Sequence, residues 1–470
     1  MSPAPGDADP GPRPGHFDPR RPVDAELELT VGDGFTLTAV GDCILSRPIS
    51  QHRHSQPAFA ALLDVLRGDG VTYGNLETVL VDHDRAAASP YPWLGDWPLS
   101  CDPGVAADLR AMGFDLLSRA NNHTLDWGLE GMRETSRLLD EHGLTHAGSG
   151  ENLSLARRAK FLETRYGRVA HVSCVTTFRE TTDALDPCGA AAGRPGVSGL
   201  AVKRVLTAPD DVFDQLGALR DRLAAAGIDD LLGEFERGGD RPQLRYEMDG
   251  DQLAAVLREI RQGKQFADFM LVALHAHEGL TSPDPGTDRW TPPLPPAFVT
   301  EFGRHAIEAG ADAVVVTGMH HLGPIEIHRR RPILTGLGNF VWSDIQTPLS
   351  ADIHRRAATA QRDAFDHPGR ATEADLTLMM NMPTFAREEC FLSVAAEMRF
   401  DRSGLTRLTL HPVDLGYGDR LTLSGLPRLA GPSQATIIFE RLRDLCAPRG
   451  TDLVTRLDAG RSTILAEVAL

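Results

Sequence analysis

The sequence predicts an α/β fold, in which short strands alternate with helices along the chain. Runs rich in apolar and β-branched residues recur, and several of them end in a polar motif. Between these runs, residues 128–142 and 296–310 carry apolar side chains near helical spacing and end at a glycine, as amphipathic helices do. Strands that alternate with helices of this length are typical of an α/β sheet. The expected strands are 35–40, 71–77, 114–120, 169–178, 268–278, 311–318 and 332–342.

Each of these runs is justified by its own residues. FTLTAV (35–40) alternates apolar and β-branched residues before a Gly-Asp pair, and VTYGNLE (71–77) is a second short run that ends in a glutamate. FDLLSRA (114–120) precedes an Asn-Asn-His motif. DFMLVALHAHE (268–278) is the clearest strand, because six apolar residues precede its polar end. The later runs, ADAVVVTG and PILTGLGNFVW, have the same apolar character.

The domain organisation follows from changes in composition along the chain. Residues 1–32 are rich in Pro, Gly and Asp and are expected to form a flexible tail. A single catalytic-type domain is expected over residues 33–345, interrupted at about 200–262 by a charged segment that we interpret as an inserted helical subdomain. Residues 346–388 are polar and mixed, typical of an insertion or lid loop. Two strand-like runs and a helix in 389–470 are expected to complete the domain.

Composition excludes several classes of function. The 470 residues carry 48 basic against 65 acidic side chains, a formal charge of −17, which disfavours binding to nucleic acid. No apolar stretch approaches the ~18–20 residues of a membrane span, and the N-terminus lacks the apolar run of a secretory signal. We therefore expect a cytoplasmic protein with no membrane partner. The six cysteines show no CxxC pair or regular spacing, which is typical of scattered reduced thiols; they are Cys43, Cys101, Cys174, Cys188, Cys390 and Cys446.

Polar residues that can bind a metal follow five of the predicted strands. In an open α/β sheet, ligands bind just beyond the carboxyl ends of the strands, so these side chains are expected to meet. Carboxylates, imidazoles and an amide oxygen together suit Mn²⁺, Zn²⁺ or Fe²⁺. A hydrogen-bonded structural histidine is the alternative for any single position. The residues are Asp42, Glu77, Asn122, His123, His275, His277, Glu278, His320 and His321.

Several motifs resemble one known family. The resemblance covers about residues 35–345, and a weaker similarity continues through 390–450. ANNHTLD together with GLGNF, in this order and spacing, is quite specific. The segments are GDCILSR (41–47), NLE (75–77), ANNHTLDWG (120–128), HAGSG (146–150), GRPGV (193–197), LHAHE (274–278), IEIHRRRPILTGLGNF (325–340) and HPVDLG (411–416). They are similar to the CapA family of poly-γ-glutamate capsule biosynthesis proteins, a branch of the calcineurin-like metallophosphoesterase superfamily. The resemblance implies a four-layer α/β/β/α sandwich.

The resemblance also implies roles for individual residues. Asp42 corresponds to the first metal-binding aspartate, and Glu77 stands where the superfamily has its bridging carboxylate. Asn122 would bind metal, and His123 would act near the leaving group as general acid. The next and final histidine ligands correspond to His275 and His320. Independently, the i,i+3 spacing places Asp126 to orient His123, with helix capping as the alternative.

This chain departs from the superfamily pattern at two positions. The superfamily begins with Asp-x-His, whereas position 44 is Ile, as is usual in the CapA branch. The late motif has Thr317 in place of a first histidine. His277 and His321 are extra donors beside expected ligands, and either could compensate. The sequence leaves open whether the site binds one divalent ion or two.

Three further residues are candidates for substrate binding, together with His321. Arg47 and Arg194 could bind an anionic substrate group, because guanidinium groups suit carboxylates and phosphates. A structural salt bridge is the alternative for each arginine. Asn339 follows a buried run and either faces the site or forms a turn.

The function implied is a metal-dependent hydrolase, in which a metal-bound hydroxide attacks a phosphoester or an amide-type bond of a small-molecule or peptide-like substrate. One alternative is a non-hydrolytic role in the biosynthesis or export of poly-γ-glutamate or another peptide-like amide polymer. A metal-binding module without turnover is a second alternative, because Thr317 replaces an expected histidine.

Overall fold

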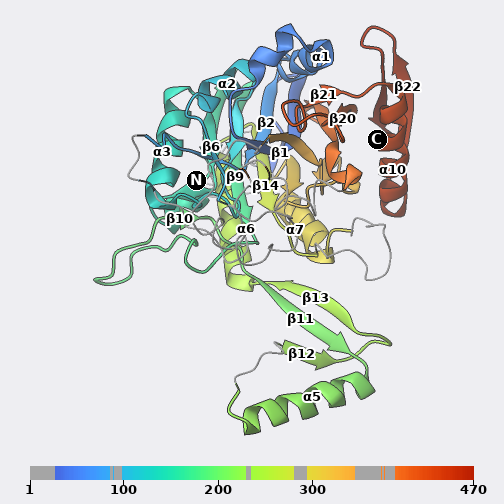
Figure 1. The fold of residues 1–470 in the computed structure, drawn as a ribbon. Helices are drawn as coiled ribbons and strands as arrows, with labels where there is room; N and C mark the ends of the chain where they lie inside the picture. The colour runs from blue at the N-terminus through green and yellow to red at the C-terminus, as the bar shows by residue number, and fades with distance from the viewer. Residues whose placement is uncertain are drawn as a thin grey trace, which may run out of the picture.

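Two β-sheets form the centre of the molecule (Figure 1). The computed structural model describes residues 27–84, 98–228, 234–279, 294–343 and 387–470, together with Ala88, Thr372 and Asp375. Among these residues, no helix is both long enough and apolar enough to cross a membrane.

The first sheet has ten strands, with the main order β22-β23-β20-β19-β1-β2-β5-β6. β1 pairs in parallel with β2 and antiparallel with β19. β18 and β21 pair with β1 and β20, respectively. The strands are β1 (Phe35–Leu45), β2 (Val71–Leu76), β5 (Leu116–Ser118), β6 (Thr145–Ala147), β18 (Asn339–Ser343), β19 (Leu392–Asp401), β20 (Gly404–Asp414), β21 (Arg428–Leu429), β22 (Leu453–Asp458) and β23 (Thr463–Val468).

The second sheet has six strands in the order β16-β17-β15-β14-β9-β8. β9, β14, β15 and β17 run parallel to one another, and β8 and β16 are antiparallel edge strands. The strands are β8 (Lys160–Thr164), β9 (Gly167–Val175), β14 (Phe269–His275), β15 (Ala313–Thr317), β16 (Ile325–His328) and β17 (Arg331–Leu334). β14 and β15 are buried along their whole length, which explains why their sequences are continuous apolar runs.

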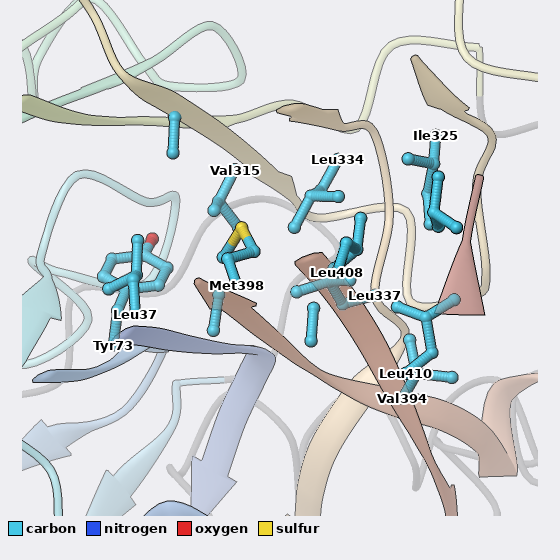
Figure 2. Close-up of a cluster of buried hydrophobic side chains, with 14 of the residues drawn as sticks. Leu37, Tyr73, Val315, Ile325, Leu334, Leu337, Val394, Met398, Leu408 and Leu410 are labelled. Atoms are coloured by element: carbon cyan, nitrogen blue, oxygen red, sulfur yellow. The ribbon is translucent and has the colours of Figure 1, made fainter. Parts of the chain in front are cut away.

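Apolar side chains from both sheets form the core between them (Figure 2). Leu37 and Met398 come from the first sheet, and Val315 and Leu334 come from the second. Strands β19 and β20, which the sequence places after residue 389, contribute to this same core. The C-terminal part of the chain therefore belongs to the same sandwich.

Helices cover the outer face of each sheet, so the layers follow the order α/β/β/α (Figure 1). This confirms the fold class predicted from the sequence. The first sheet is covered by α1 (Pro57–Leu66), α2 (Val105–Met112) and α3 (Gly128–Glu141), and the second by α6 (Gly250–Gln265) and α7 (Ala297–Glu308); α10 (Pro432–Cys446) packs on β20, β22 and β23.

Shorter elements connect these layers. They are the helix α4 (Leu153–Arg157), the strands β3 (Val79–Leu80), β4 (Ser100–Cys101), β7 (Ser149–Gly150) and β10 (Gly196–Val197), and 3₁₀ turns at Ser50–His54, Glu388–Phe391 and Ala447–Arg449.

The insertion predicted at about 200–262 differs from its expected helical form. It contains one helix, α5 (Asp210–Ala225), beside a three-stranded sheet made of β11 (Val202–Ala208), β12 (Glu234–Arg237) and β13 (Gln243–Met248). This unit extends away from the sandwich (Figure 1). The following helix, α6, packs on the second sheet instead. The strands were missed because sequences such as EFER and QLRYEM are charged and largely exposed, so they lack the apolar alternation of a buried strand.

The predicted N-terminal tail extends too far along the chain. Leu29 and Val31 are buried in the core between the sheets, and Thr30 Oγ1 donates a 2.7 Å hydrogen bond to Asp268. Leu27, Leu29 and Val31 alternate with polar residues, but this short pattern follows a segment rich in Pro, Gly and Asp, with which it was grouped. Residues 1–26 of the tail, and most of the 346–388 segment, lie outside the described residues.

The close approach of two backbone segments explains why a glycine, Gly41, precedes Asp42 at the end of the first predicted strand. A Cβ atom on Gly41 would lie 1.8 Å from the carbonyl oxygen of Gly338, so only glycine fits there. At this point the strand that pairs with β1 changes: Ala39 pairs with β19, whereas Asp42 pairs with Asn339 of β18. The irregularity brings the GD and GLGNF motifs side by side, although they are about 300 residues apart in the sequence.

Candidate metal centre

The polar residues predicted from the strand ends converge at one end of the sandwich. Asp42 lies on β1, Glu77 directly follows β2, and His275 is the last residue of β14. His320 lies three residues beyond β15. Two groups of potential ligands result, Asp42 with Glu77 and His320, and Glu77 with His275 and His277, and within each group the donor atoms all lie within 4.8 Å of one another. Glu77 is common to both groups.

Glu77 provides the test of whether these residues fit a cation. Its side chain is fully buried, and neither carboxylate oxygen has a hydrogen-bond partner among the described residues. Burial, reinforced by the negative charge of Asp42, raises its pKa to about 8. A buried carboxylate without donors is costly, and a bound cation would compensate it. The nitrogen and oxygen donors fit a divalent metal such as Mn²⁺, Zn²⁺ or Fe²⁺.

The donor atoms of His275 and His277 lie near Oε1 of Glu77, and that of Asn122 lies next to His275. His275 Nε2 is 3.5 Å and His277 Nε2 is 3.8 Å from this oxygen. The two histidine nitrogens are 2.8 Å apart, and Asn122 Oδ1 lies 2.9 Å from His275 Nε2. The structure therefore brings Asn122 and the extra histidine His277 into the group, as the sequence predicted for both positions.

Asp42 is held by neutral donors as well as by His320. Its Oδ1 accepts a 2.8 Å hydrogen bond from Asn75 Nδ2, and its Oδ2 accepts one of 3.1 Å from the Gly318 amide. Burial opposes ionisation of Asp42, but the contacts with His320, the charge of His275 and the Asn75 bond outweigh it and lower its pKa well below the ordinary value. Asp42 is therefore a carboxylate at neutral pH.

Asn75 is a functional residue that the sequence reasoning missed. Its Nδ2 also lies 3.2 Å from His275 Nδ1, and its Oδ1 accepts from Asn121. Asn75 thus links Asp42 of the first sheet to His275 of the second. The available signal was its position in NLE, two residues before Glu77, where β alternation places both side chains on one face.

Thr317, which replaces an expected histidine, contacts the ring of a ligand residue. Its Oγ1 lies 2.9 Å from His275 Nδ1. The hydroxyl therefore helps to set the orientation of this imidazole, as a second-layer partner does in metal sites.

His320 is positioned by an unusual backbone conformation and by an amide. Its φ is 57°, in the left-handed region that non-glycine residues rarely adopt. Its Nδ1 lies 2.9 Å from Asn339 Oδ1 and 3.4 Å from Asp42 Oδ2. Because Asn339 Nδ2 donates to the Cys390 carbonyl, its Oδ1 is directed at the ring. Asn339 therefore faces the candidate site, and its amide contacts His320; its predicted role in substrate binding stays a prediction.

His123 and Asp126 form the pair that their spacing predicted. His123 Nδ1 lies 2.6 Å from Asp126 Oδ2, and His123 Nε2 lies 4.0 Å from Glu77 Oε1. Asp126 also accepts a 2.6 Å hydrogen bond from the Leu99 amide. The N-cap of α3 is Trp127, whose side chain makes no capping hydrogen bond.

The structure does not bring the other predicted substrate residues into either ligand group. Arg194 donates to the carbonyls of Glu180 and Asp183, so its guanidinium supports a local loop. Arg47 contacts the Thr422 carbonyl and His52. His321 is buried, with Nδ1 bonded to the neighbouring Leu322 carbonyl. His321 lies next to His320 in the sequence but outside the ligand groups, because consecutive residues at a turn point in different directions.

The fold and this donor set define a class: a four-layer α/β/β/α protein with a candidate divalent metal centre at the carboxyl ends of its strands. The family described as "Bacterial capsule synthesis protein PGA_cap" matches residues 36–344. The chain belongs to this family.

Individual relatives range from close to distant. The chain is 40% identical to "Uncharacterized protein y4sH" of Sinorhizobium fredii over 91% of this chain and 93% of the relative. It is 22% identical to "PGA biosynthesis protein CapA" of Bacillus subtilis over 66% of this chain and 64% of that one. A solved structure of a putative 5′-nucleotidase from Staphylococcus aureus aligns with a TM-score of 0.34 at 13% identity, over 88% of this chain and 58% of that chain.

Metal binding is expected to release protons at pH 7 and to become tighter as the pH rises toward 9. Burial lowers the pKa of His320, but the Asp42 bond and the Glu77 charge outweigh it and raise the pKa to about 9. Glu77, with a pKa of about 8, is also protonated at pH 7, and both groups must lose their protons to act as ligands. Titration calorimetry in two buffers of different ionisation enthalpy measures the protons released. An affinity independent of pH between 6 and 9 would contradict this expectation.

Proposed function

We propose that the protein is a metal-dependent hydrolase that cleaves a phosphoester or an amide-type bond in a small-molecule or peptide-like substrate. The observation that carries this proposal is the buried Glu77 carboxylate, which is shared by two groups of donors and lacks a hydrogen-bond partner among the described residues. A divalent ion bound there would polarise the scissile bond and lower the pKa of bound water. Asp42, Glu77, Asn122, His275, His277 and His320 are the residues that would hold it.

His123 is proposed to hold the proton that the leaving group requires. Asp126 accepts from Nδ1, which fixes the tautomer and raises the basicity of the ring. The opposite nitrogen, Nε2, faces the ligand group across the 4.0 Å separation from Glu77. This arrangement suits a general acid at the edge of the site, where a leaving oxygen or nitrogen would take the proton.

Replacing His123 with Ala is expected to lower turnover by about 10²- to 10⁴-fold while bound metal is retained, because the residue supplies a proton and lies outside both ligand groups. Asp126→Asn is expected to cost about 10- to 100-fold, since the amide no longer stabilises the protonated ring. Metal content and initial rates are measured together. His305→Ala, on the exposed surface of α7, is the matched control and should leave both unchanged.

The substrate screen separates the two bond types and the alternatives. Phosphomonoesters, phosphodiesters, nucleotides and γ-glutamyl amides are offered to the metal-loaded protein. Turnover of any of them that is lost in His123→Ala supports the hydrolase. Turnover of amides alone would assign the bond type.

A second candidate function is a non-hydrolytic role in the synthesis or export of an amide polymer. The family description, capsule synthesis, and the name of the Bacillus subtilis relative favour it. Metal binding without turnover of any substrate, together with binding of poly-γ-glutamate that His123→Ala leaves intact, would support this role or a metal-binding module over the hydrolase.

A further inference from the structure

Arg119 is a buried cation in the described part of the structure that the candidate metal centre does not use. It directly follows β5, and none of its surface is exposed. Its Nε, Nη1 and Nη2 atoms have no hydrogen-bond partner within the described residues. Burial lowers the pKa of the guanidinium to about 10, so the group keeps its charge at neutral pH. A buried, uncompensated charge is among the most costly features a fold can contain.

The side chain of Arg119 lies on the helix-covered side of the first sheet. Leu117 packs in the core beneath the helices, and Ser118 faces the second sheet, with its Oγ 2.5 Å from Ser173 Oγ. Alternation of side chains along the strand direction returns Arg119 to the side of Leu117. The metal ligands Asp42 and His275 are bonded between the two sheets, through Asn75. Arg119 therefore belongs to a different layer of the molecule.

His146 adds a second unsatisfied polar group on the same side of the sheet. It lies on β6 and pairs in register with Leu117 of β5. Its Nδ1 is buried and has no partner in the part of the chain that the structure describes, whereas its Nε2 lies 3.2 Å from Asp140 Oδ1. Both groups therefore belong to the same side of the sheet, where burial and then the charge of Arg119 lower the pKa of His146 to about 4.

Within the part of the chain that the structure describes, the groups near Arg119 supply too little negative charge to balance it. The Cys101 thiol is electrostatically coupled to Arg119, but burial raises its pKa far above neutrality, so it is uncharged. Asp140 pairs with His146 and is 75% exposed, so its charge is largely screened by solvent. Lys160 adds further positive charge near His146. An anion is the component that this environment lacks.

We propose that Arg119 and His146 form a buried site for a small inorganic monoanion of the size of chloride. The guanidinium N–H groups would donate to the anion. The bound negative charge would also offset the Arg119 charge that now disfavours protonation of His146, so that its Nδ1 would donate to the anion while its Nε2 donates to Asp140. A monoanion matches the single unpaired guanidinium charge. The complete burial of Arg119 favours a small ion over phosphate or an organic carboxylate, since a larger group would require a cavity open to solvent.

The site would stabilise the loop that leads to the metal centre. The Arg119 carbonyl accepts a 2.6 Å hydrogen bond from Thr124 Oγ1, and the residues enclosed by this bond include Asn122 and His123. An anion that anchors Arg119 therefore anchors one end of this loop, from the opposite side of the sheet.

The first test compares thermal unfolding at 5 and 200 mM chloride, with sodium gluconate keeping the ionic strength constant. The wild-type midpoint is expected to rise by about 2–5 °C with chloride, because only the folded state binds it. Arg119→Met is expected to show no chloride dependence. Arg133→Met, which removes an exposed arginine, is the matched control and should keep the wild-type response. Equal responses of the wild type and Arg119→Met would overturn the proposal.

A second test does not depend on folding of the variant. Crystals of the wild-type protein grown in sodium bromide are expected to show an anomalous peak in contact with the Arg119 guanidinium and His146 Nδ1. Water molecules alone at this position, without an anomalous peak, would overturn the proposal. Both tests are independent of metal loading and turnover, so they hold whether or not the protein is a hydrolase.

Discussion

Glu77→Gln is expected to weaken divalent metal binding by more than about 100-fold and, at the same time, to make the metal-free protein more stable at pH 8.5. Both effects have one cause. The Glu77 carboxylate is fully buried beside Asp42 without a hydrogen-bond partner among the described residues, so its negative charge is useful only when a cation is present. Glutamine keeps the shape of the side chain and removes the charge.

The sign of the pH dependence follows from the raised pKa of Glu77. Its pKa is about 8 in the folded protein and about 4.5 when unperturbed. Below pH 4.5 both states hold the proton, and between pH 4.5 and 8 only the folded state does. The contribution of Glu77 to stability is therefore fully present at low pH and is lost as the pH rises toward 8. The gain from Glu77→Gln should accordingly be larger at pH 8.5 than at pH 5.

Chemical denaturation in the presence of EDTA at these two pH values measures the stability difference, and titration calorimetry measures metal affinity. Glu151→Gln is the control, because Glu151 is half exposed and pairs only with Arg133 among the described ion pairs. Metal affinity equal to the wild type, or a metal-free variant that is less stable at pH 8.5, would contradict the role assigned to Glu77.

The second large effect is expected at the opposite end of the strands, where Asp312→Ala should lower the free energy of unfolding by about 3–5 kcal/mol. Asp312 and Lys264 form an ion pair of 2.9 Å in which both side chains are fully buried. Asp312 also accepts from the Met270 amide at 2.9 Å and from Arg331 Nε at 3.1 Å. Removing the carboxylate leaves the buried Lys264 ammonium with only the Asp268 carbonyl as acceptor and without a counter-charge, and it leaves the Met270 amide without its acceptor.

Urea denaturation monitored by circular dichroism tests this expectation. The double variant Lys264→Met/Asp312→Leu should recover part of the lost stability, because it removes the unpaired charge of Lys264 but still leaves the Met270 amide and Arg331 Nε without their acceptor. Glu134→Ala, which breaks an exposed pair with Arg137, should cost less than about 1 kcal/mol. A single variant as stable as the wild type would show that the buried pair does not stabilise the fold.

Much of the candidate centre could be predicted from local sequence. Asp42, Glu77 and His275 end apolar runs, and ligands bind beyond the carboxyl ends of the strands in an α/β protein, so the pattern identified these residues. That the first two lie on one sheet and His275 on the other was not part of the pattern. The His123–Asp126 pair is equally local, because three residues separate its members. These predictions needed only the strand and turn pattern, which short stretches of sequence encode.

Partners from distant segments could not be predicted in this way. That Asn339 orients His320, and that Cys390 in turn fixes the Asn339 amide, depends on β18 and β19 lying beside β1. The contacts of Arg194 were not predicted either, although Asp183 and Glu180 lie only 11 and 14 residues away in the sequence. Arg194 has the chemistry to bind an anion, but backbone carbonyls already occupy its guanidinium, and nothing in its neighbourhood in the sequence reveals this.

By itself, the sequence determined the α/β class, the oxygen and nitrogen character of the centre and the residues at the strand ends, because periodicity and residue chemistry are local properties. Only the tertiary structure decided which atoms meet. It placed Asn75 and Thr317 against His275, brought the C-terminal strands beside β1, and left Arg119 buried without a counter-ion in the described residues. The physical reason is that hydrogen bonding and burial depend on the pairing of segments far apart in the chain, which no short window of sequence contains.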